Sequence, residues 1–204
     1  ELDLSTPTGS ADTRGIFTVQ PRPMQKVERL AATAYIGTIP NNIFEQYFPV
    51  GVRLNYYILE NLGVELAGSY AVRSDPGLTE TIEDPRGVGA DGVLLGDRQI
   101  SHFNFGLTWS PFFGKTSFLN QGVSYFDAFV FAGVGAVVKE SQVDFGTPAN
   151  TGISPEGVLG LGLMYLLSQD ISVRVDFRQY IFQSVRGGTA TPSEVSLGFT
   201  YFVF

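Results

Sequence analysis

The sequence predicts an all-β protein, an eight-stranded antiparallel up-and-down transmembrane β-barrel that follows a poorly structured N-terminal tail. Apolar residues make up 44% of the 204 residues and charged residues only 16%, against roughly 25% charged in soluble domains. The longest apolar runs, 128–138 and 157–167, fall well short of the about 20 residues of a spanning helix. They match the ~9–11 residues of a tilted membrane strand. From about Leu30, apolar and polar residues alternate with the period of two that is typical of strands.

The N-terminal tail, residues 1–26, has no periodicity and is rich in Thr, Ser, Gly and Pro, including Pro21-Arg22-Pro23. We expect it to lie outside the barrel domain, residues 27–204, on the periplasmic side. A short helix over 24–30 is the alternative. The chain starts at Glu1 without Met or an apolar leader. This favours a mature N-terminus after removal of a signal peptide, although an expression product would look the same.

Eight strands follow from the alternation. Arg53 and Asn55, for example, alternate with Val52, Leu54 and Tyr56. Such alternation over many segments indicates β structure rather than helices. The predicted strands are residues 30–38, 47–58, 63–74, 98–110, 125–139, 156–167, 171–182 and 193–204.

The connections between these strands alternate in length. Tight turns follow the second and sixth strands, at 60–63 and 168–170, whereas the links after the third, fifth and seventh strands are longer. Outer-membrane barrels show this pattern, with short periplasmic turns and long outer loops. The expected exception is a long periplasmic link over 111–124, after the fourth strand.

A membrane barrel differs from a soluble barrel in whether the apolar face of the sheet points outward or inward. A soluble barrel of the lipocalin type has its apolar face inside and its charges outside. Here the polar face is thin and almost without Lys, and an outward charge at the bilayer centre costs roughly 2–4 kcal/mol. The apolar face is therefore predicted to face lipid. Aromatic residues near the strand ends are predicted to form interfacial girdles: Tyr47, Phe48, Trp109, Phe112, Phe113, Tyr125, Phe126, Tyr180 and Phe182.

Charged residues on the inward face predict a luminal polar network. Buried charges must be paired, and eight strands leave an interior just wide enough for side chains to fill. This favours a structural plug, and a small selective pore is the alternative. The predicted network consists of Arg53, Glu65, Arg73, Asp127, Arg174, Asp176 and Arg178.

Motifs for catalysis or for metal binding are weak. His102 is the single histidine; Ser101 points to the opposite face and Ser110 is distant along the strand. A serine on another strand remains open. Gly114-Lys115-Thr116 lacks the earlier glycine of a phosphate loop, because Trp109 stands there. We therefore predict no catalytic residues and no enzyme.

No cofactor or metal residues are predicted either. Cys is absent and a second histidine ligand is missing. The acidic loop 75–97 lacks the dense carboxylate spacing of a calcium loop; its acidic residues include Glu80, Glu83, Asp84 and Asp91. The net charge of −7 argues against nucleic acid as a partner.

Two stretches resemble a known family. One has Ile39-Pro40-Asn41-Asn42 before the strand 50–57 and Glu60-Asn61-Leu62-Gly63 after it; the other is Trp109-Ser110-Pro111-Phe112-Phe113-Gly114-Lys115, followed by Tyr125-Phe126-Asp127. Together they resemble the outer-membrane β-barrel domain family common in myxobacteria, a relative of the OmpA-type barrels. The resemblance covers most of 26–204, and the Trp-Ser-Pro-x-x-Gly-Lys element is its most specific part.

This resemblance implies an eight-stranded barrel in the outer membrane of a Gram-negative bacterium, without an assigned activity. Some barrels of this kind are associated with gliding-motility or polysaccharide-export machines. The final Tyr201-Phe202-Val203-Phe204 resembles the signal read by the barrel assembly machinery, although Phe204 is out of phase with the apolar positions.

The predicted function is therefore a non-enzymatic envelope anchor or a subunit of a membrane-spanning assembly. Its expected partners are outer-membrane lipid, other envelope proteins, and the assembly machinery during insertion. The alternatives are a small-solute channel and a lipid-modifying barrel enzyme that uses His102.

Overall fold

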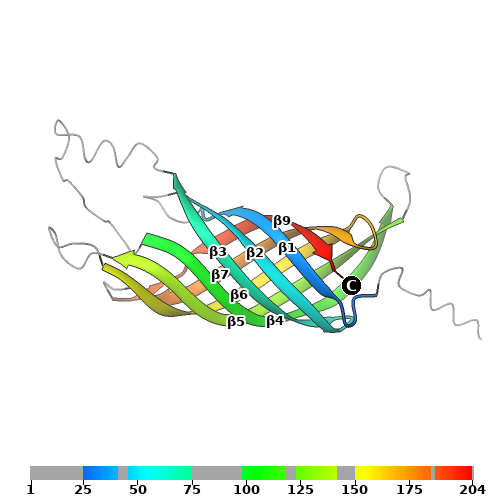
Figure 1. Ribbon diagram of the computed structural model, residues 1–204, viewed down its shortest axis with the longest axis horizontal. Coiled ribbons are helices and arrows are strands. Elements are labelled where there is room, and N and C mark those ends of the chain that lie inside the picture. The colour runs from blue at the N-terminus through cyan, green and yellow to red at the C-terminus, as the bar shows by residue number, and fades with distance from the viewer. Residues whose placement is uncertain are drawn as a thin grey trace, which may run out of the picture.

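The computed structural model describes residues 25–40, 46–74, 98–117, 123–141, 150–184 and 187–203. Eight long strands form a closed antiparallel barrel, which confirms the predicted fold (Figure 1). Each strand pairs with its neighbours in the order β6-β5-β4-β3-β2-β1-β9-β7, and the pairing of β6 with β7 closes the ring. The short β8 (Thr189–Ala190) pairs with the end of β7. The long strands are β1 (Leu30–Thr38), β2 (Gln46–Leu59), β3 (Leu62–Ser74), β4 (Arg98–Ser117), β5 (Val123–Ser141), β6 (Asn150–Leu166), β7 (Ile171–Gln183) and β9 (Ser193–Phe202).

The two ends of the barrel differ. The tight turns predicted after the second and sixth strands are confirmed: Glu60 and Asn61 join β2 to β3, and residues 167–170 join β6 to β7. The amides of Leu167 and Ser168 both donate to the carbonyl of Ile171, at 2.9 and 3.1 Å. The chain also enters β1 and leaves β9 at this end. The acidic loop 75–97, considered as a calcium site, is outside the described residues.

The predicted long link over 111–124 is wrong, because most of it is strand. β4 continues to Ser117 and β5 begins at Val123. Trp109 pairs with Val130 whereas Phe112 pairs with Ala128, so a β-bulge puts two residues of β4 opposite one of β5. The bulge contains Pro111, which cannot donate to a ladder. It also shifts the alternation by one position, which is why the sequence pattern seemed to stop at residue 110.

The side chains have the orientation predicted for a membrane barrel. On β9, four apolar residues are 41–54% exposed, while three polar residues that alternate with them are at most 2% exposed. The outward residues are Val195, Leu197, Phe199 and Tyr201; the inward ones are Glu194, Ser196 and Thr200. Across the described ranges, no helix is long and apolar enough to cross a membrane.

The predicted aromatic girdles are only partly correct. Phe48, Trp109 and Phe112 face outward and are 37, 49 and 70% exposed. Tyr47 and Tyr180 point into the lumen instead and are fully buried, and Phe182 is 3% exposed. These inward residues were assigned to the girdles because they lie near strand ends. The phase of the alternation, and not the distance from a strand end, decides whether a side chain points inward or outward.

The last residues before β1 are not helical, so the alternative of a short helix over 24–30 is wrong for its described part. A turn at Val27 and Glu28 leads directly into β1, and Glu28 has a φ of 60°. A positive φ is incompatible with a right-handed helix. Residues 1–24, the greater part of the predicted tail, lie outside the described residues, as does Phe204.

Candidate functional site: the barrel lumen

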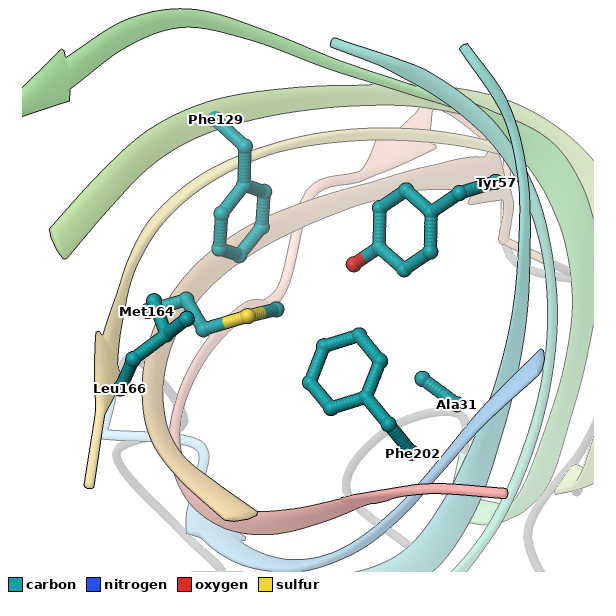
Figure 2. Close-up of a cluster of buried hydrophobic side chains, with 6 residues drawn as sticks. All are labelled: Ala31, Tyr57, Phe129, Met164, Leu166 and Phe202. Atoms are coloured by element: carbon teal, nitrogen blue, oxygen red, sulfur yellow. The ribbon is translucent and has the colours of Figure 1, made fainter. Parts of the chain in front are cut away.

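An apolar cluster fills the lumen at the tight-turn end. Figure 2 shows its side chains converging inside the ring of strands. The rings of Tyr57 and Phe202 stack with their centroids 6.0 Å apart. The cluster draws on five strands, and its members are Ala31, Tyr57, Phe129, Met164, Leu166 and Phe202.

A charged layer lies next along the lumen. Arg53 from β2 and Arg174 and Arg178 from β7 face three carboxylates, and all six side chains are at most 1% exposed. Three positive charges therefore balance three negative ones, which is the condition for keeping charges buried at tolerable cost. The carboxylates are Glu65, Asp176 and Glu194.

Asp176 is the centre of this charged layer. Arg174 makes a bidentate contact with it, with Nε to Oδ2 and Nη2 to Oδ1 both at 2.8 Å. Arg53 Nη1 donates to its Oδ2 at 2.9 Å from across the barrel. Bidentate charge-assisted bonds are among the strongest and most geometrically specific hydrogen bonds in proteins. Asp176 therefore fixes two guanidinium groups from strands that are not neighbours.

The two glutamates complete the layer on either side. Glu65 accepts from Arg174 Nη2 at 2.8 Å and also pairs with Arg178. Glu194 accepts from Arg53 Nη2 at 2.7 Å and from the hydroxyl of Tyr180 at 2.9 Å. These bonds connect β2, β3, β7 and β9 through the middle of the barrel.

Aromatic rings cover the arginines. The guanidinium carbons of Arg53 and Arg174 lie 3.5 and 4.3 Å from the ring centroids of Tyr35 and Phe129. Arg178 lies 4.4 Å from that of Phe131. Cation–π contacts of this kind strengthen when water is excluded. Phe129 belongs to the apolar cluster at the tight-turn end, so its contact with Arg174 joins the charged layer to that cluster.

Two glycines leave space for the ring of Phe131 inside the barrel. Gly106 of β4 and Gly133 of β5 face each other in the ladder. A Cβ on either would lie 2.8 Å from the Cζ atom of Phe131 and 2.3–2.6 Å from a backbone oxygen of the adjacent strand. Real Cβ contacts are not that short, so the large ring requires both glycines.

A third layer lies toward the long-loop end and contains His102. Its Nδ1 is 2.8 Å from Glu156 Oε2, and its Nε2 is 3.1 Å from Gln99 Oε1. Its ring lies 4.5 Å from that of Tyr180. Ser69 is its cross-strand partner on β3, but both ring nitrogens are directed at Glu156 and Gln99. The histidine is fully buried and is built into the packing of the lumen.

Five of the seven predicted network residues come together in the charged layer, and two do not. Asp127 lies at the tight-turn end, where it pairs with Lys26. Arg73 lies at the long-loop end and lines a cavity of about 270 Å³ with Arg98 and Glu140. The five in the charged layer are Arg53, Glu65, Arg174, Asp176 and Arg178.

Sequence reasoning missed several partners in the lumen. Glu194 is in phase with the inward residues of β9 and could have been found from the alternation. Asn55, which donates to Glu65 at 2.8 Å, was on the predicted polar face but was not included in the network. Lys26 had no such signal, since it stands before the first strand.

Lys26 closes the tight-turn mouth. Its side chain is 3% exposed, pairs with Asp127 and lies 5.2 Å from the ring centroid of Tyr57. The amides of Lys26 and Val27 donate to Glu60 Oε1 at 3.0 and 3.3 Å. Arg29 Nη2 then bonds Asp170 Oδ1 at 2.6 Å, so residues 26–29 connect both tight turns.

Replacing Lys26 with methionine is expected to lower the free energy of unfolding by about 1–3 kcal/mol, because Asp127 would lose its charged partner while buried. The urea midpoint of the protein in lipid vesicles, followed by fluorescence of the single tryptophan, Trp109, measures this. A matched variant that combines Lys26→Met with Asp127→Asn should recover part of the loss. Equal losses in the single and double variants would show that the unpaired charge of Asp127 is not the cause of the loss.

A closed barrel with an apolar outer surface and paired charges inside is a transmembrane β-barrel of the outer-membrane class. Only closure satisfies every backbone group of a sheet in lipid, and outward apolar with inward polar residues is the arrangement of outer-membrane barrels. The protein is therefore located in the bacterial outer membrane, surrounded by its lipid. Among the described residues, no three His, Asp or Glu side chains gather as a metal-binding group.

The fold is similar to that of the N-terminal β-barrel domain of Pseudomonas aeruginosa OprF. The TM-score is 0.51 at 11% identity, over 87% of this chain and 99% of that one. Ail, the attachment invasion locus protein of Yersinia pestis, gives 0.42 at 10% identity over 88% and 99% of the two chains. Neisserial surface protein A gives 0.38 at 10% identity over 86% and 94%. At 11% identity the likeness to the OprF domain concerns the fold alone.

Neither a family model nor a curated protein matches the chain.

Proposed function

We propose that the protein is a non-enzymatic barrel that serves as an envelope anchor or as a subunit of a membrane-spanning assembly. The filled lumen carries this proposal. An apolar layer, a charge-balanced layer and the layer of His102 follow one another along the barrel, and Lys26 occupies the tight-turn mouth. Because the side chains of the barrel fill its interior, we expect partners to bind to its outer surfaces.

The β4–β5 hairpin is the surface best placed to meet a partner. It extends past the other strands at the tight-turn end (Figure 1), and Phe112 on it is 70% exposed. Exposed aromatic residues are enriched at protein interfaces. This end is the periplasmic one in barrels with short periplasmic turns. We therefore expect the partners to be envelope proteins on the periplasmic side.

Site-specific photocrosslinking in intact outer membranes tests the assembly role. A photoreactive residue replaces Lys115 on the hairpin, and a matched variant carries it at the lipid-facing Leu163. We expect a discrete adduct with an envelope protein from position 115, identified by mass spectrometry, and none from position 163. Adducts that are absent or identical at both positions would count against an assembly subunit.

A small-solute channel is the rival function. We expect planar bilayers that contain the purified barrel to remain without discrete conductance steps, because the charged layer and the apolar cluster occupy the lumen. Steps that persist in independent preparations, and that change in size in an Arg53→Ala variant, would favour the channel.

A lipid-modifying enzyme is the second rival. We expect the outer-membrane lipids of cells that carry His102→Ala to be unchanged, compared by mass spectrometry with cells that carry the parent protein. A lipid species that disappears in this variant, but not in Ser101→Ala, would favour the enzyme.

We also propose kinship with the outer-membrane barrels of myxobacterial type. The most specific element of that resemblance, Trp109 to Lys115, coincides with the bulge and the start of the protruding hairpin. Insertion by the barrel assembly machinery belongs to the same proposal. A chain that lacks its last four residues should accumulate in the periplasm if the C-terminal strand carries the signal.

A further inference from the structure

Two neighbouring strands of the wall, β3 and β4, separate at the long-loop end (Figure 1). Their ladder ends where Tyr70 pairs with Ser101, although both strands extend beyond this pair. From there on, β3 continues in its ladder with β2, and β4 in its ladder with β5. The register of β4 shifts between Gln99 and Ser101, which makes Ile100 the extra residue of a bulge. A bulge bends its strand and can end local pairing.

A cavity of about 270 Å³ lies where the two strands separate, lined by residues 70–73 and 98–100 and by Glu140. Tyr70 and Val72 are on the outer surface of the barrel and are 59 and 47% exposed, whereas Ala71 and Gln99 point inward and are both 6% exposed. The cavity is therefore a lateral cleft in the wall, which buried residues close toward the lumen. Its volume is just below the ~300–1,000 Å³ of ligand pockets, so it suits a small polar group rather than a whole lipid.

The lateral cleft lies at the edge of the apolar band. From Leu62 to Val72 the outward residues of β3 carry no charge. At about 3.4 Å per residue and a tilt of about 40°, this stretch covers about 26 Å of height, against ~25 Å for the apolar band of an outer-membrane barrel. Arg98 and Glu140 are the first charged outward residues beyond the band on β4 and β5. The cleft is therefore at the level of the lipid headgroups.

Arg98 is the principal hydrogen-bond donor of the cleft. Its Nη1 lies 3.3 Å from Glu140 Oε2, and this contact uses only one of the five N–H groups of a guanidinium. Both side chains are about a third exposed, at 33 and 29%, and ion pairs of this kind are weak. A phosphate can accept two parallel N–H bonds from a guanidinium, which makes it a stronger partner than this carboxylate contact.

Two further polar side chains line the cleft beside Arg98. Arg73 contributes a second guanidinium group. Gln99 has its Oε1 3.1 Å from His102 Nε2, so this contact does not use the amide NH2 group. Glu140 is the one carboxylate among the lining residues that the structure describes. These lining side chains thus carry two positive charges and one negative charge, which favours an anion.

The apolar part of the lining indicates where the anion comes from. Tyr70, Val72 and Ile100 lie beside the charged groups of the cleft. A free phosphate gains nothing from apolar neighbours, whereas a phosphate on an amphiphile brings an apolar part that packs against them. Such amphiphiles surround the barrel at this level.

We propose that the lateral cleft between β3 and β4 binds a phosphate group, with Arg98 as its principal contact, and that a lipid headgroup of the surrounding leaflet carries this phosphate. The proposal goes beyond the anchor or assembly role and does not depend on it. It makes the cleft a site for one bound lipid, in addition to the lipids that surround the apolar band.

Native mass spectrometry of the whole chain in detergent tests the site. The protein is titrated with dioleoyl phosphatidic acid, whose headgroup is a phosphate monoester, or with dioleoyl phosphatidylcholine, whose phosphate carries a choline cation. We expect the first phosphatidic acid to bind Arg98→Met about tenfold more weakly than the parent, because a charge-assisted bond to phosphate is lost. Phosphatidylcholine should bind both proteins equally.

Glu140→Gln is the matched variant, because it breaks the same ion pair from the other side. We expect it to bind phosphatidic acid about threefold more tightly than the parent, since it removes the opposing charge and releases Arg98. If the ion pair had only a structural role, the two variants would lose affinity together. The pair is partly exposed, so both variants are expected to fold.

Arg29→Met is the control at the other end of the barrel, where Arg29 pairs with Asp170 at 2.6 Å. It should bind phosphatidic acid as the parent does. An Arg98→Met variant with the affinity of the parent, or an equal loss in Arg29→Met, would overturn the proposal. Inorganic phosphate at the same concentration should not displace the lipid. Displacement would mean that the cleft is a site for free anions, which contradicts the lipid headgroup as the source.

Discussion

Replacing Arg174 with methionine is expected to lower the free energy of unfolding by about 3–5 kcal/mol, the largest loss among the substitutions considered for this barrel. Arg174 is fully buried and contacts both Asp176 and Glu65 at 2.8 Å. Its removal leaves three carboxylates to two arginines in the charged layer. Urea unfolding in vesicles, followed by the fluorescence of Trp109, measures the loss.

A charge-balanced double variant separates charge from packing. Arg174→Met combined with Asp176→Asn leaves two complete pairs, Arg53 with Glu194 and Arg178 with Glu65. We expect the double variant to be more stable than Arg174→Met alone, because it buries no charge without a partner. If the double variant lost as much free energy of unfolding as the two single variants together, the packing of the side chains, and not their charge balance, would stabilise the layer.

Arg98 supplies the control for a less buried pair. Arg98 and Glu140 lie 3.3 Å apart, and both side chains are about a third exposed, at 33 and 29%. Pairs of this kind contribute about 0–1 kcal/mol. Arg98→Met should therefore change the urea midpoint little. A loss as large as that of Arg174→Met would mean that burial does not govern these ion pairs.

Replacing Leu161 with arginine is expected to lower the free energy of unfolding in vesicles by about 2–4 kcal/mol. Leu161 is 58% exposed on the outward face of β6, near the middle of that strand. A guanidinium there would have to leave water for hydrocarbon. The same urea titration in vesicles measures the effect.

Leu167→Arg is the matched control for lipid exposure. Leu167 is 57% exposed, almost the same fraction as Leu161, but it lies in the turn after β6. Near the interface the cost of an arginine falls to about 0–1 kcal/mol. Similar losses at both positions would contradict the placement of the bilayer around the middle of the barrel.

Most of the barrel wall could be predicted because alternation is a local property of the sequence. The prediction failed where a local feature breaks the period, at the bulge of Ser110 and Pro111. It failed also at the start of β6, which begins at Asn150 rather than at residue 156 and includes Pro155. Because proline cannot donate a hydrogen bond to the ladder, a segment that contains it is not assigned as a strand from the sequence pattern.

The candidate site was predictable as a set of inward residues but not as a set of pairs. Arg53 and Asp176 are 123 residues apart in the sequence and meet across the lumen. The pairing follows from the closure and the stagger of the barrel, which a period of two does not specify. Lys26 could not be predicted for another reason. It precedes the first strand and enters the lumen from the end of the barrel, so the alternation within the strands does not include it.

The seam of the ring joins the two ends of the sequence. β1 pairs with β9 from Ala31 and Phe202 onward, and the amide of Val203 donates to the carbonyl of Leu30 at 2.7 Å. The first strand therefore finds one of its two neighbours only when the last has been made. Until then both β1 and β7 expose backbone groups that hydrocarbon cannot satisfy. Closure of the ring therefore requires β9, and a wall without β9 is an open sheet with two edges that lipid cannot satisfy.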